Sequence, residues 1–591
     1  MIRIANCSGF YGDRLTAMRE MLDGGDIDYL TGDYLAELTM LILGRDQLKD
    51  ASLGYAKSFV RQLEGCLGDA LERGVKVVSN AGGLNPAGLA DRIREVATGL
   101  GLDPVVAHVE GDNLIGRAAE LGFDGALTAN AYLGGFGIAE ALNQGADVVV
   151  TGRVTDASVV VGPGVAAFGW TPSSYDELAG AVVAGHVIEC GTQATGGNFS
   201  GFLDLPRSAQ PLGFPIAELT ADGSSVITKH DGTGGAVTVD TVTAQLMYEI
   251  QTATYLNPDV SVDLPSVALS DDGADRVRVS GVRGSTPPAQ LKVATNRIGG
   301  HRNQMEFVLT GLDIEAKAAW VRDQLEARLD PRPALVAWSQ SRVPVPDADT
   351  EEGASCLLRV VVQDPSADVV VRAFSGAAVE LALASYPGFT MTSPPGPASP
   401  YGIYRAAYVD RSEVTERVVV AGEPAGRAGP PGPGVETKGA DETASAGAAL
   451  PPRAHHPAHP SVHGGSASTA AAVGSSAPTN RVPLGTFVHA RSGDKGGDAN
   501  VGLWVKQGEK RDARAAWLLS VVTPAWVQEL LPETRSLAVE VYPLANLGGV
   551  NVLVRGLLGE GVAASTRFDP QAKAVGEWLR ARTVDVPEEL L

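Results

Sequence analysis

Four short, mostly apolar runs in the first 150 residues each end in a polar turn that contains glycine, and this repeat is the strongest constraint on the fold. The runs are residues 2–5, 75–78, 104–109 and 146–150. Helical segments separate them, among them one amphipathic helix predicted over residues 52–73, and strands that alternate with helices form parallel sheets with right-handed crossovers. The sequence therefore predicts a Rossmann-like α/β domain over residues 1–205.

The turns that follow the four runs are predicted to lie together at one edge of the sheet. They are residues 6–13, 79–86, 110–113 and 151–158, and all are rich in Gly, Asn, Ser and Asp. Open α/β sheets bind ligands at the carboxyl ends of their strands, so we expect a polar crevice here. The first turn has only the spacing G-x-x-G, which does not favour an NAD site.

The densest set of reactive side chains follows the fourth run. Arg153 and Asp156 lie in the turn, and His186 and Glu189 lie near the end of a predicted helix. Glu189, at a helix end before a glycine-rich loop, is a candidate general acid or base. His186 and Cys190 are four residues apart, so the pair is either a Cys–His nucleophile or a buried histidine beside a core cysteine.

Two other places remain open between a functional and a plain structural interpretation. Asp33 and Glu37 are four residues apart and would share a helix face, either as crevice carboxylates or as acids at a solvated helix start. His230 and Asp231, which follow Lys229, form either a wall of the crevice or a polar turn.

The rest of the chain divides by composition. Residues 206–422 predict an α+β domain packed on the first, and residues 483–591 predict a small α+β domain. Residues 423–482 are dominated by Pro, Gly, Ala, Ser and Thr without periodicity, which predicts a disordered linker. Metal binding by its three clustered histidines, His455, His456 and His459, would be incidental.

A predicted hairpin in the last domain carries Arg491, Asp494 and Lys495 at a polar tip. Backbone N–H groups together with Arg and Lys could hold a phosphate or carboxylate there, and a solvated turn is the alternative.

Composition excludes several classes of function. A net charge of −22 disfavours a nucleic-acid surface. No apolar run reaches the roughly 18 residues of a membrane helix, and the N-terminus has no signal-peptide pattern. The four cysteines are far apart and form no CxxC pair, so they predict neither a zinc site nor a disulfide framework. We expect a cytoplasmic protein with free thiols.

Several long motifs occur in one order along the chain. They are the segments 5–13 (ANCSGFYGD), 78–83 (VSNAGG), 151–156 (TGRVTD), 185–191 (GHVIECG) and 229–233 (KHDGT). With these motifs the chain resembles the acyclic terpene utilisation (AtuA) family. Segments 491–496 and 551–556 look like the ferredoxin-fold domain of that family. The resemblance implies the degradation of citronellol- and geraniol-type compounds through acyl-CoA intermediates, without fixing a reaction.

The first functional hypothesis is an enzyme acting on an acyl-CoA or related carboxylate, by hydration, dehydration or C–C lysis. Its candidate catalytic residues are Asp156, Glu189, His186, His230 and Asp231. Its candidate substrate-binding residues are Ser8, Gly9, Asp33, Asn80, Gly82, Gly83, Arg153, Asn198, Arg491 and Lys495. No metal ligands are assigned, a divalent ion is not excluded, and a coenzyme A thioester is a candidate substrate.

The second hypothesis is a non-catalytic binding or scaffold subunit of a catabolic acyl-CoA complex. The small C-terminal domain on a long tether would then dock a partner enzyme of the same pathway or another copy of the chain, since a tether raises local concentration without fixing geometry. No nucleic-acid or membrane partner is expected.

Overall fold

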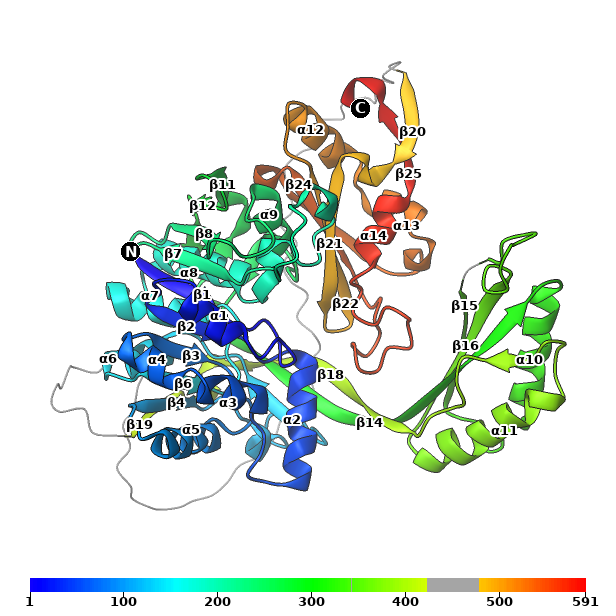
Figure 1. Ribbon diagram of the computed structural model, residues 1–591, viewed down its shortest axis with the longest axis horizontal. Coiled ribbons are helices and arrows are strands. Elements are labelled where there is room, and N and C mark those ends of the chain that lie inside the picture. Colours follow the sequence, from blue (N-terminus) through cyan, green and yellow to red (C-terminus); the bar gives the residue numbers. More distant parts are fainter. Residues whose placement is uncertain (342, 422–477) are drawn as a thin grey trace.

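The computed structural model describes residues 1–341, 343–421 and 478–591, which form a body, an arm and a C-terminal domain (Figure 1). The arm, residues 299–398, projects from the body, and the C-terminal domain lies against the body beside it. Most of the segment predicted to be a linker, including His455, His456 and His459, lies outside the described residues. The predicted linker extends to residue 482, whereas strand β20 (Thr479–Pro483) already begins at Thr479.

The body is built on a ten-stranded sheet in the order β11-β12-β8-β7-β1-β2-β3-β6-β4-β19. Its central strands β1 (Ile2–Asn6), β2 (Tyr29–Gly32), β3 (Lys76–Ser79), β6 (Val148–Thr151) and β4 (Val106–Glu110) are parallel. The predicted parallel sheet is therefore confirmed, and the carboxyl ends of five strands meet at one edge.

Antiparallel strands extend the sheet at both sides. They are β7 (Pro215–Leu219), β8 (Ser225–Lys229), β11 (Ala268–Asp271) and β12 (Val277–Ser280) on one side and β19 (Arg417–Ala421) on the other. Residues 206–422 thus supply strands to the first sheet as well as to a second one. A small sheet of β9 (Thr254–Leu256), β10 (Ser261–Asp263) and β13 (Arg283–Ser285) covers part of this region.

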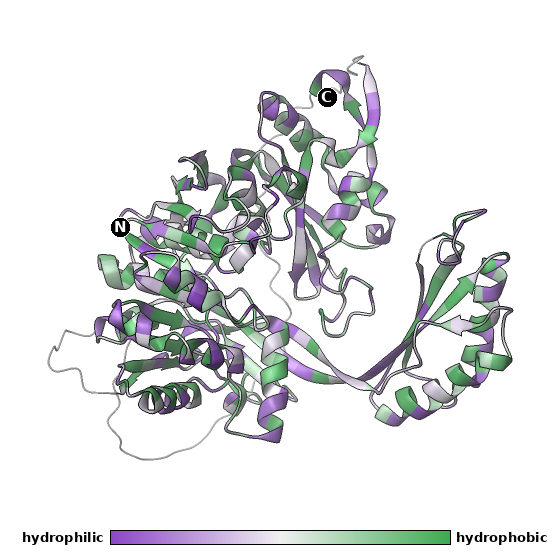
Figure 2. Ribbon diagram, in the orientation of Figure 1, coloured by the Kyte–Doolittle hydropathy of each residue, from purple (hydrophilic) through white to green (hydrophobic). Residues whose placement is uncertain are grey.

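Helices cover both faces of the sheet with separate apolar cores. One face holds α1 (Ala17–Asp23), α3 (Lys57–Glu64), α4 (Leu67–Glu72) and α5 (Pro86–Leu100). The other holds α6 (Phe136–Asn143), α7 (Ser158–Phe168), α8 (Tyr175–Ile188) and α9 (Val239–Leu246). Helix α8 is buried on all sides from Leu178 onward, as expected for a helix that is apolar all round. Figure 2 shows hydrophobic and hydrophilic residues interspersed along the helices and strands of all three parts of the molecule.

Two local predictions are wrong. The single helix predicted over residues 52–73 is broken into α3 and α4 at Gly65 and Cys66, and glycine is a poor helix former. Asp33 does not stand on a helix with Glu37: it follows strand β2 directly, and helix α2 (Glu37–Lys49) begins after an extended Ala36. Residues 29–32 form a strand because they pair with β1 and β3. This pairing cannot be recognised from the four residues alone.

A long ribbon connects the body to the arm. Strand β14 (Gln290–Thr310) pairs with β18 (Ser399–Asp410) along its first half, where it also pairs with β5 (Thr128–Ala131). Its second half joins β15 (Leu335–Ser341), β16 (Ser355–Asp364) and β17 (Thr390–Met391), packed on α10 (Ile314–Arg328) and α11 (Phe374–Glu380). The pairing shifts register between Ile298 and Gly300, and such bulges bend strands.

The C-terminal domain has an antiparallel sheet in the order β21-β22-β24-β23. Its elements are β21 (Val488–Lys495), β22 (Asp498–Val505), β23 (Val539–Leu544), β24 (Gly549–Val554), β25 (Thr583–Pro587), α12 (Arg511–Val521), α13 (Pro524–Leu530) and α14 (Val575–Ala581). One sheet face packs on the helices in a core of its own. The predicted small α+β domain is therefore confirmed.

The other face of this domain is docked on the body of the same chain. Trp504 is 0% exposed, belongs to the same apolar core as α8, and donates from Nε1 to Asp240 Oδ1 at 3.1 Å. The Asn500 side chain accepts from the Glu249 amide at 2.8 Å and donates to Met247 O at 3.2 Å. The neighbouring Asn551 donates to two more carbonyls of the body. The contact is thus both apolar and hydrogen-bonded.

Because Trp504 anchors this contact, Trp504→Ala should weaken docking by about 3–5 kcal/mol, the usual cost of deleting a large buried aromatic. Hydrogen exchange measured by mass spectrometry should show faster exchange in peptides covering residues 239–251, where the Glu249 amide loses its partner. Trp320→Ala, at a 49% exposed tryptophan of the arm, is the matched control. Equal exchange in the two variants would contradict the docking role.

Candidate functional site

The carboxyl edge of the parallel sheet carries a chain of buried polar side chains. Asn80 donates from Nδ2 to the Asp33 carboxylate and accepts from the Tyr34 amide at 2.8 Å. Asn6 accepts from the Ser8 amide at 3.0 Å and donates to Glu189 O at 3.3 Å. The predicted crevice residues Asp33 and Asn80 are therefore hydrogen-bonded to each other, and Asn6 connects the turn after β1 with the end of α8.

Arg153 and Asp156 form an ion pair at this edge. Arg153, only 3% exposed, donates from Nη1 to Asp156 Oδ1 at 2.6 Å, and its guanidinium lies 4.2 Å from the ring centre of Tyr132. Its amide donates to the buried carboxylate of Asp112 at 2.8 Å, which fixes the turn. Within the described ranges the buried Arg153 Nε makes no hydrogen bond. The side chain therefore keeps one donor for a ligand.

Glu189 and His186 lie beside this pair, at the end of α8. Oε1 of Glu189 is 3.4 Å from Nδ1 of His186, and the His186 ring packs on Tyr255 with centres 5.0 Å apart. Neither nitrogen of His186, nor Glu189 Oε2, makes a hydrogen bond of normal geometry within the part of the chain that the structure describes. The small residue Gly185 lets α8 pack closely against the backbone of Ala157, since a Cβ at residue 185 would lie 2.8 Å from it.

Burial shifts the pKa values of Glu189, Asp33 and His186. Burial and the charge of Asp156 raise the pKa of Glu189 well above its usual value, and they do the same for Asp33. Burial and then the charge of Lys495 lower the pKa of His186 to about 4. Near neutral pH His186 is thus neutral, and burial favours the protonated form of Glu189 next to an ion pair, an arrangement suited to proton transfer.

The Cys–His nucleophile is not favoured. Burial, followed by the charge of Glu189, raises the pKa of the Cys190 thiol well above its ordinary value, so the thiolate is disfavoured. His186 faces Glu189 and Tyr255 instead.

The hairpin of the C-terminal domain closes the crevice. The end of this hairpin, from Gly493 in β21 to Gly496 in the turn, packs against two tyrosines of the rest of the chain. A Cβ on Gly493 would lie 2.3 Å from Tyr248, and one on Gly496 would lie 3.2 Å from Tyr404. Lys495 is close enough for its charge to lower the pKa values of both Glu189 and His186.

Arg491 is not at the tip but inside strand β21. Its guanidinium lies 4.1 Å from the ring centre of Tyr248, and Nη1 donates to Asn198 O at 3.5 Å. Asn198, which has φ 55°, therefore joins the docked hairpin to the body.

Other predicted residues lie elsewhere or serve packing. His230 packs on the end of α1, with Nε2 3.0 Å from Met21 O, and Asp231 is exposed. Neither contacts the Arg153 pair in the described structure. The predicted glycines allow close packing: a Cβ would lie 2.5 Å from the Cys190 carbonyl at Gly9, 2.5 Å from Thr151 O at Gly82 and 2.4 Å from the Leu43 side chain at Gly83. Ser8 Oγ donates to Phe10 O.

Several crevice residues carry no sequence signal. They are Tyr132, Tyr248, Glu249, Tyr255, Lys292 and Tyr404, from separate elements of the body and ribbon. Long-range strand pairing brings Lys292 and Tyr404 to the site, through β14 with β5 and β18, and Tyr248 and Glu249 follow the end of α9.

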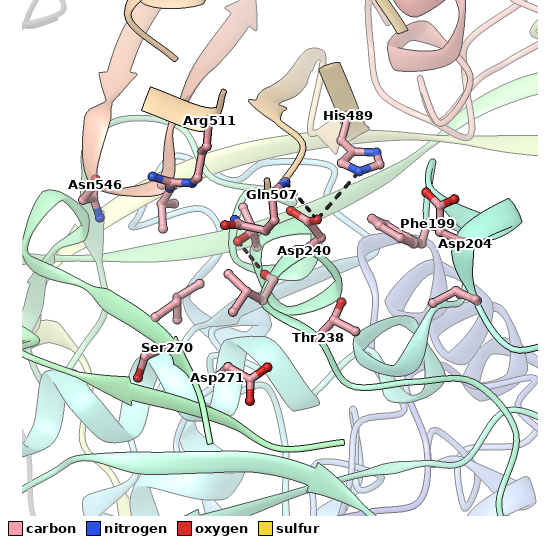
Figure 3. Close-up of a pocket in the computed structure, with 15 residues that line it drawn as sticks. Phe199, Asp204, Thr238, Asp240, Ser270, Asp271, His489, Gln507, Arg511 and Asn546 are labelled. Carbon is pink, nitrogen blue, oxygen red and sulfur yellow. Dashed lines mark hydrogen bonds and ion pairs between the residues drawn. The ribbon is translucent and has the colours of Figure 1, made fainter. Parts of the chain in front are cut away.

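A separate pocket of about 660 Å³ lies between the body and the C-terminal domain (Figure 3). Phe199, Asp240 and Asp271 line it from the body, opposite His489 and Arg511. None of the charged residues around Arg153 lines it, so it is distinct from the crevice. Its size suits a small molecule.

No group of three or more His, Cys, Asp or Glu side chains suited to a metal ion occurs within residues 1–341, 343–421 and 478–591. Among the same residues no helix is both long and apolar enough to cross a membrane.

Two segments of the chain match models of known protein families. Residues 2–420 match the model described as acyclic terpene utilisation family protein AtuA, and residues 482–585 match the AtuA ferredoxin-like domain. No curated protein and no solved structure matches the chain. The resemblance of the sequence motifs is therefore confirmed.

Lys495→Met should raise the pKa of His186, because it removes a positive charge that opposes the imidazolium. NMR titration of histidine-labelled full-length protein measures the shift. Lys506→Met is the matched control: Lys506 lowers the pKa of His489, so this variant should move His489 and leave His186 in place. An unmoved His186 in Lys495→Met would contradict the placement of the hairpin.

Glu189→Gln should stabilise the protein increasingly as pH rises. The pKa of Glu189 is higher folded than unfolded, so its contribution to the free energy of unfolding is complete below the unfolded value of about 4.3 and is lost as pH rises through the folded value. The glutamine does not titrate, so the difference in midpoint of denaturation between variant and wild type should grow as pH rises above the unfolded value and through the raised folded value. A difference that is constant with pH would refute the raised pKa. Glu177→Gln, at the start of the same helix, serves as control.

Proposed function

The chain belongs to the AtuA family of acyclic terpene utilisation proteins, and we propose that it is an enzyme that transfers protons on a branched carboxylic acid or its acyl-CoA thioester. The reaction class is hydration, dehydration or C–C lysis. The observation that carries the proposal is the buried Glu189, whose pKa is raised, beside neutral His186 and the Arg153–Asp156 ion pair.

These reactions need an acid, a base and a stabiliser of negative charge. In a dehydration, a base removes the proton α to the carbonyl, charge develops on the carbonyl oxygen, and an acid protonates the leaving hydroxyl, which departs as water. We assign the acid to Glu189, the base to Asp156 or His186, and charge stabilisation to the free Nε of Arg153. General acid–base groups of this kind contribute about 10²–10⁴-fold each.

The scaffold alternative has less structural support. It needs the C-terminal domain to be free for a partner, whereas one face of that domain is docked on the body through Trp504 and Asn500. The hairpin also places Lys495 at the crevice, which a tethered docking module does not require.

A thermal-shift screen of the full-length protein tests the substrate class. The panel holds CoA, citronellyl-, geranyl- and short branched acyl-CoA thioesters, the matching free acids, ATP and NAD. A ligand at about 100 times its dissociation constant adds roughly 2.7 kcal/mol to the stability of the part it binds. We expect shifts with acids or thioesters and none with ATP or NAD. A flat response of folded protein would argue for the scaffold function.

Turnover of the ligand found in this way tests the catalytic assignment. Asp156→Asn and Glu189→Gln should each lose about 10²-fold or more in kcat, because each removes one proton-transfer group. Glu177→Gln is the control and should keep its rate. The assignment is wrong if both site variants turn over at the wild-type rate.

A further inference from the structure

Lys292 is a second cation at the crevice, on strand β14 of the ribbon. Its side chain is only 25% exposed, and Nζ lies 4.8 Å from the ring centre of Tyr132 and 5.6 Å from that of Tyr404. The one hydrogen bond that Nζ makes within the described residues is a long one, 3.4 Å, to Glu37 Oε1. An ammonium group has three donors, so two remain for a ligand.

Lys292 and Arg153 share an aromatic neighbour. The Arg153 guanidinium lies 4.2 Å from the same Tyr132 ring centre. Two cations gathered on one ring repel each other, and each is paired with a single acid, Arg153 with Asp156 and Lys292 with Glu37. An anion that contacts both cations would relieve this repulsion.

Two further donors belong to Arg153 and to Tyr404, whose ring Lys292 contacts. The buried Arg153 Nε makes no hydrogen bond within the described part of the chain, and the buried Tyr404 hydroxyl, which lies near Glu37 and Tyr132, makes none of normal geometry there. Buried donors without acceptors are unfavourable, and a ligand that accepts their hydrogen bonds removes that cost.

Lys292 is suited to binding rather than to covalent catalysis. Burial opposes its charged form, but Tyr132 and Glu37 outweigh burial and raise the pKa of Lys292 above its ordinary value. A protonated lysine holds an anion and is not a nucleophile.

We propose that Lys292, Arg153 and Tyr404 form a subsite for a free carboxylate of the substrate. The assignment rests on the proposed function, because it places the substrate against Arg153. A carboxylate fits better than a phosphate: the surroundings already hold Glu37, Asp156 and Asp494, so a single negative charge is tolerated more easily than two. A planar carboxylate also matches the fork of an arginine.

Calorimetric titration of the full-length protein tests the subsite with four probes: citronellate, citronellamide, citronellyl-CoA and inorganic phosphate. The amide has nearly the same shape as the acid but carries no charge. Citronellate should bind, and the amide should bind at least about tenfold more weakly, the factor expected for one lost charged hydrogen bond.

Substitutions of Lys292 and Tyr404 test whether these residues bind the carboxylate. Lys292→Met should weaken citronellate binding about tenfold or more and leave the amide unchanged, whereas Lys292→Arg should restore much of the affinity. Tyr404→Phe, which keeps the ring and removes one donor, tests the same subsite if Lys292→Met does not fold. Lys317→Met, on the arm, is the matched control, because that lysine donates to Thr310 O at 2.7 Å within the arm.

Each outcome decides the proposal. Equal affinities for acid and amide, no binding of citronellate, or a Lys292 dependence shown only by phosphate or citronellyl-CoA would overturn the carboxylate subsite. The proposed function fails separately, when Asp156→Asn and Glu189→Gln keep their turnover, and that result leaves the binding measurements intact.

Discussion

The buried positive charge of Arg153 is the constraint on which the site depends. An isolated ion in a protein interior costs several kcal/mol, so its surroundings must supply compensation. Asp156 gives the paired charge, Tyr132 covers the guanidinium, and Asp112 holds the backbone of the turn. Burial around the same pair raises the pKa of Glu189 and lowers that of His186. The burial that makes the Arg153 charge costly thus also shifts the protonation equilibria of the groups available for chemistry.

Three distant parts of the sequence assemble the crevice. The sheet edge brings Asp33, Arg153 and Glu189, the ribbon brings Lys292 and Tyr404, and the docked hairpin brings Lys495. Their positions depend on strand pairing across the body and on the contact anchored by Trp504. The interdomain pocket is built from the same docked surfaces but from different side chains (Figure 3). The ferredoxin-like domain is therefore a structural part of the crevice and not only an attachment to it.

Local sequence could predict the parallel sheet and its polar edge, because apolar runs and glycine turns report directly on buried strands and their ends. It therefore located Arg153, Asp156 and Glu189. It could not show that residues 29–32 form strand β2, because this strand depends on pairing with β1 and β3. The local sequence therefore predicts a helix at Asp33, where the structure has the end of a strand. Lys292 stands in an ordinary alternating strand, where nothing local distinguishes a crevice cation from a surface one. The glycines predicted to bind substrate, Gly9, Gly82 and Gly83, lie where neighbouring segments pack too closely for a Cβ.

The place of the hairpin in the sequence has a consequence for synthesis. Domains fold in the order in which they leave the ribosome, so the body and the arm can fold before β21 and β22 exist. During that interval the crevice is open, Glu189 has no lysine opposite it, and Tyr248 and Tyr404 are uncovered. A chain interrupted before residue 488 carries the sheet edge without its closing hairpin. Completion of the crevice is thus a late event in the synthesis of each molecule.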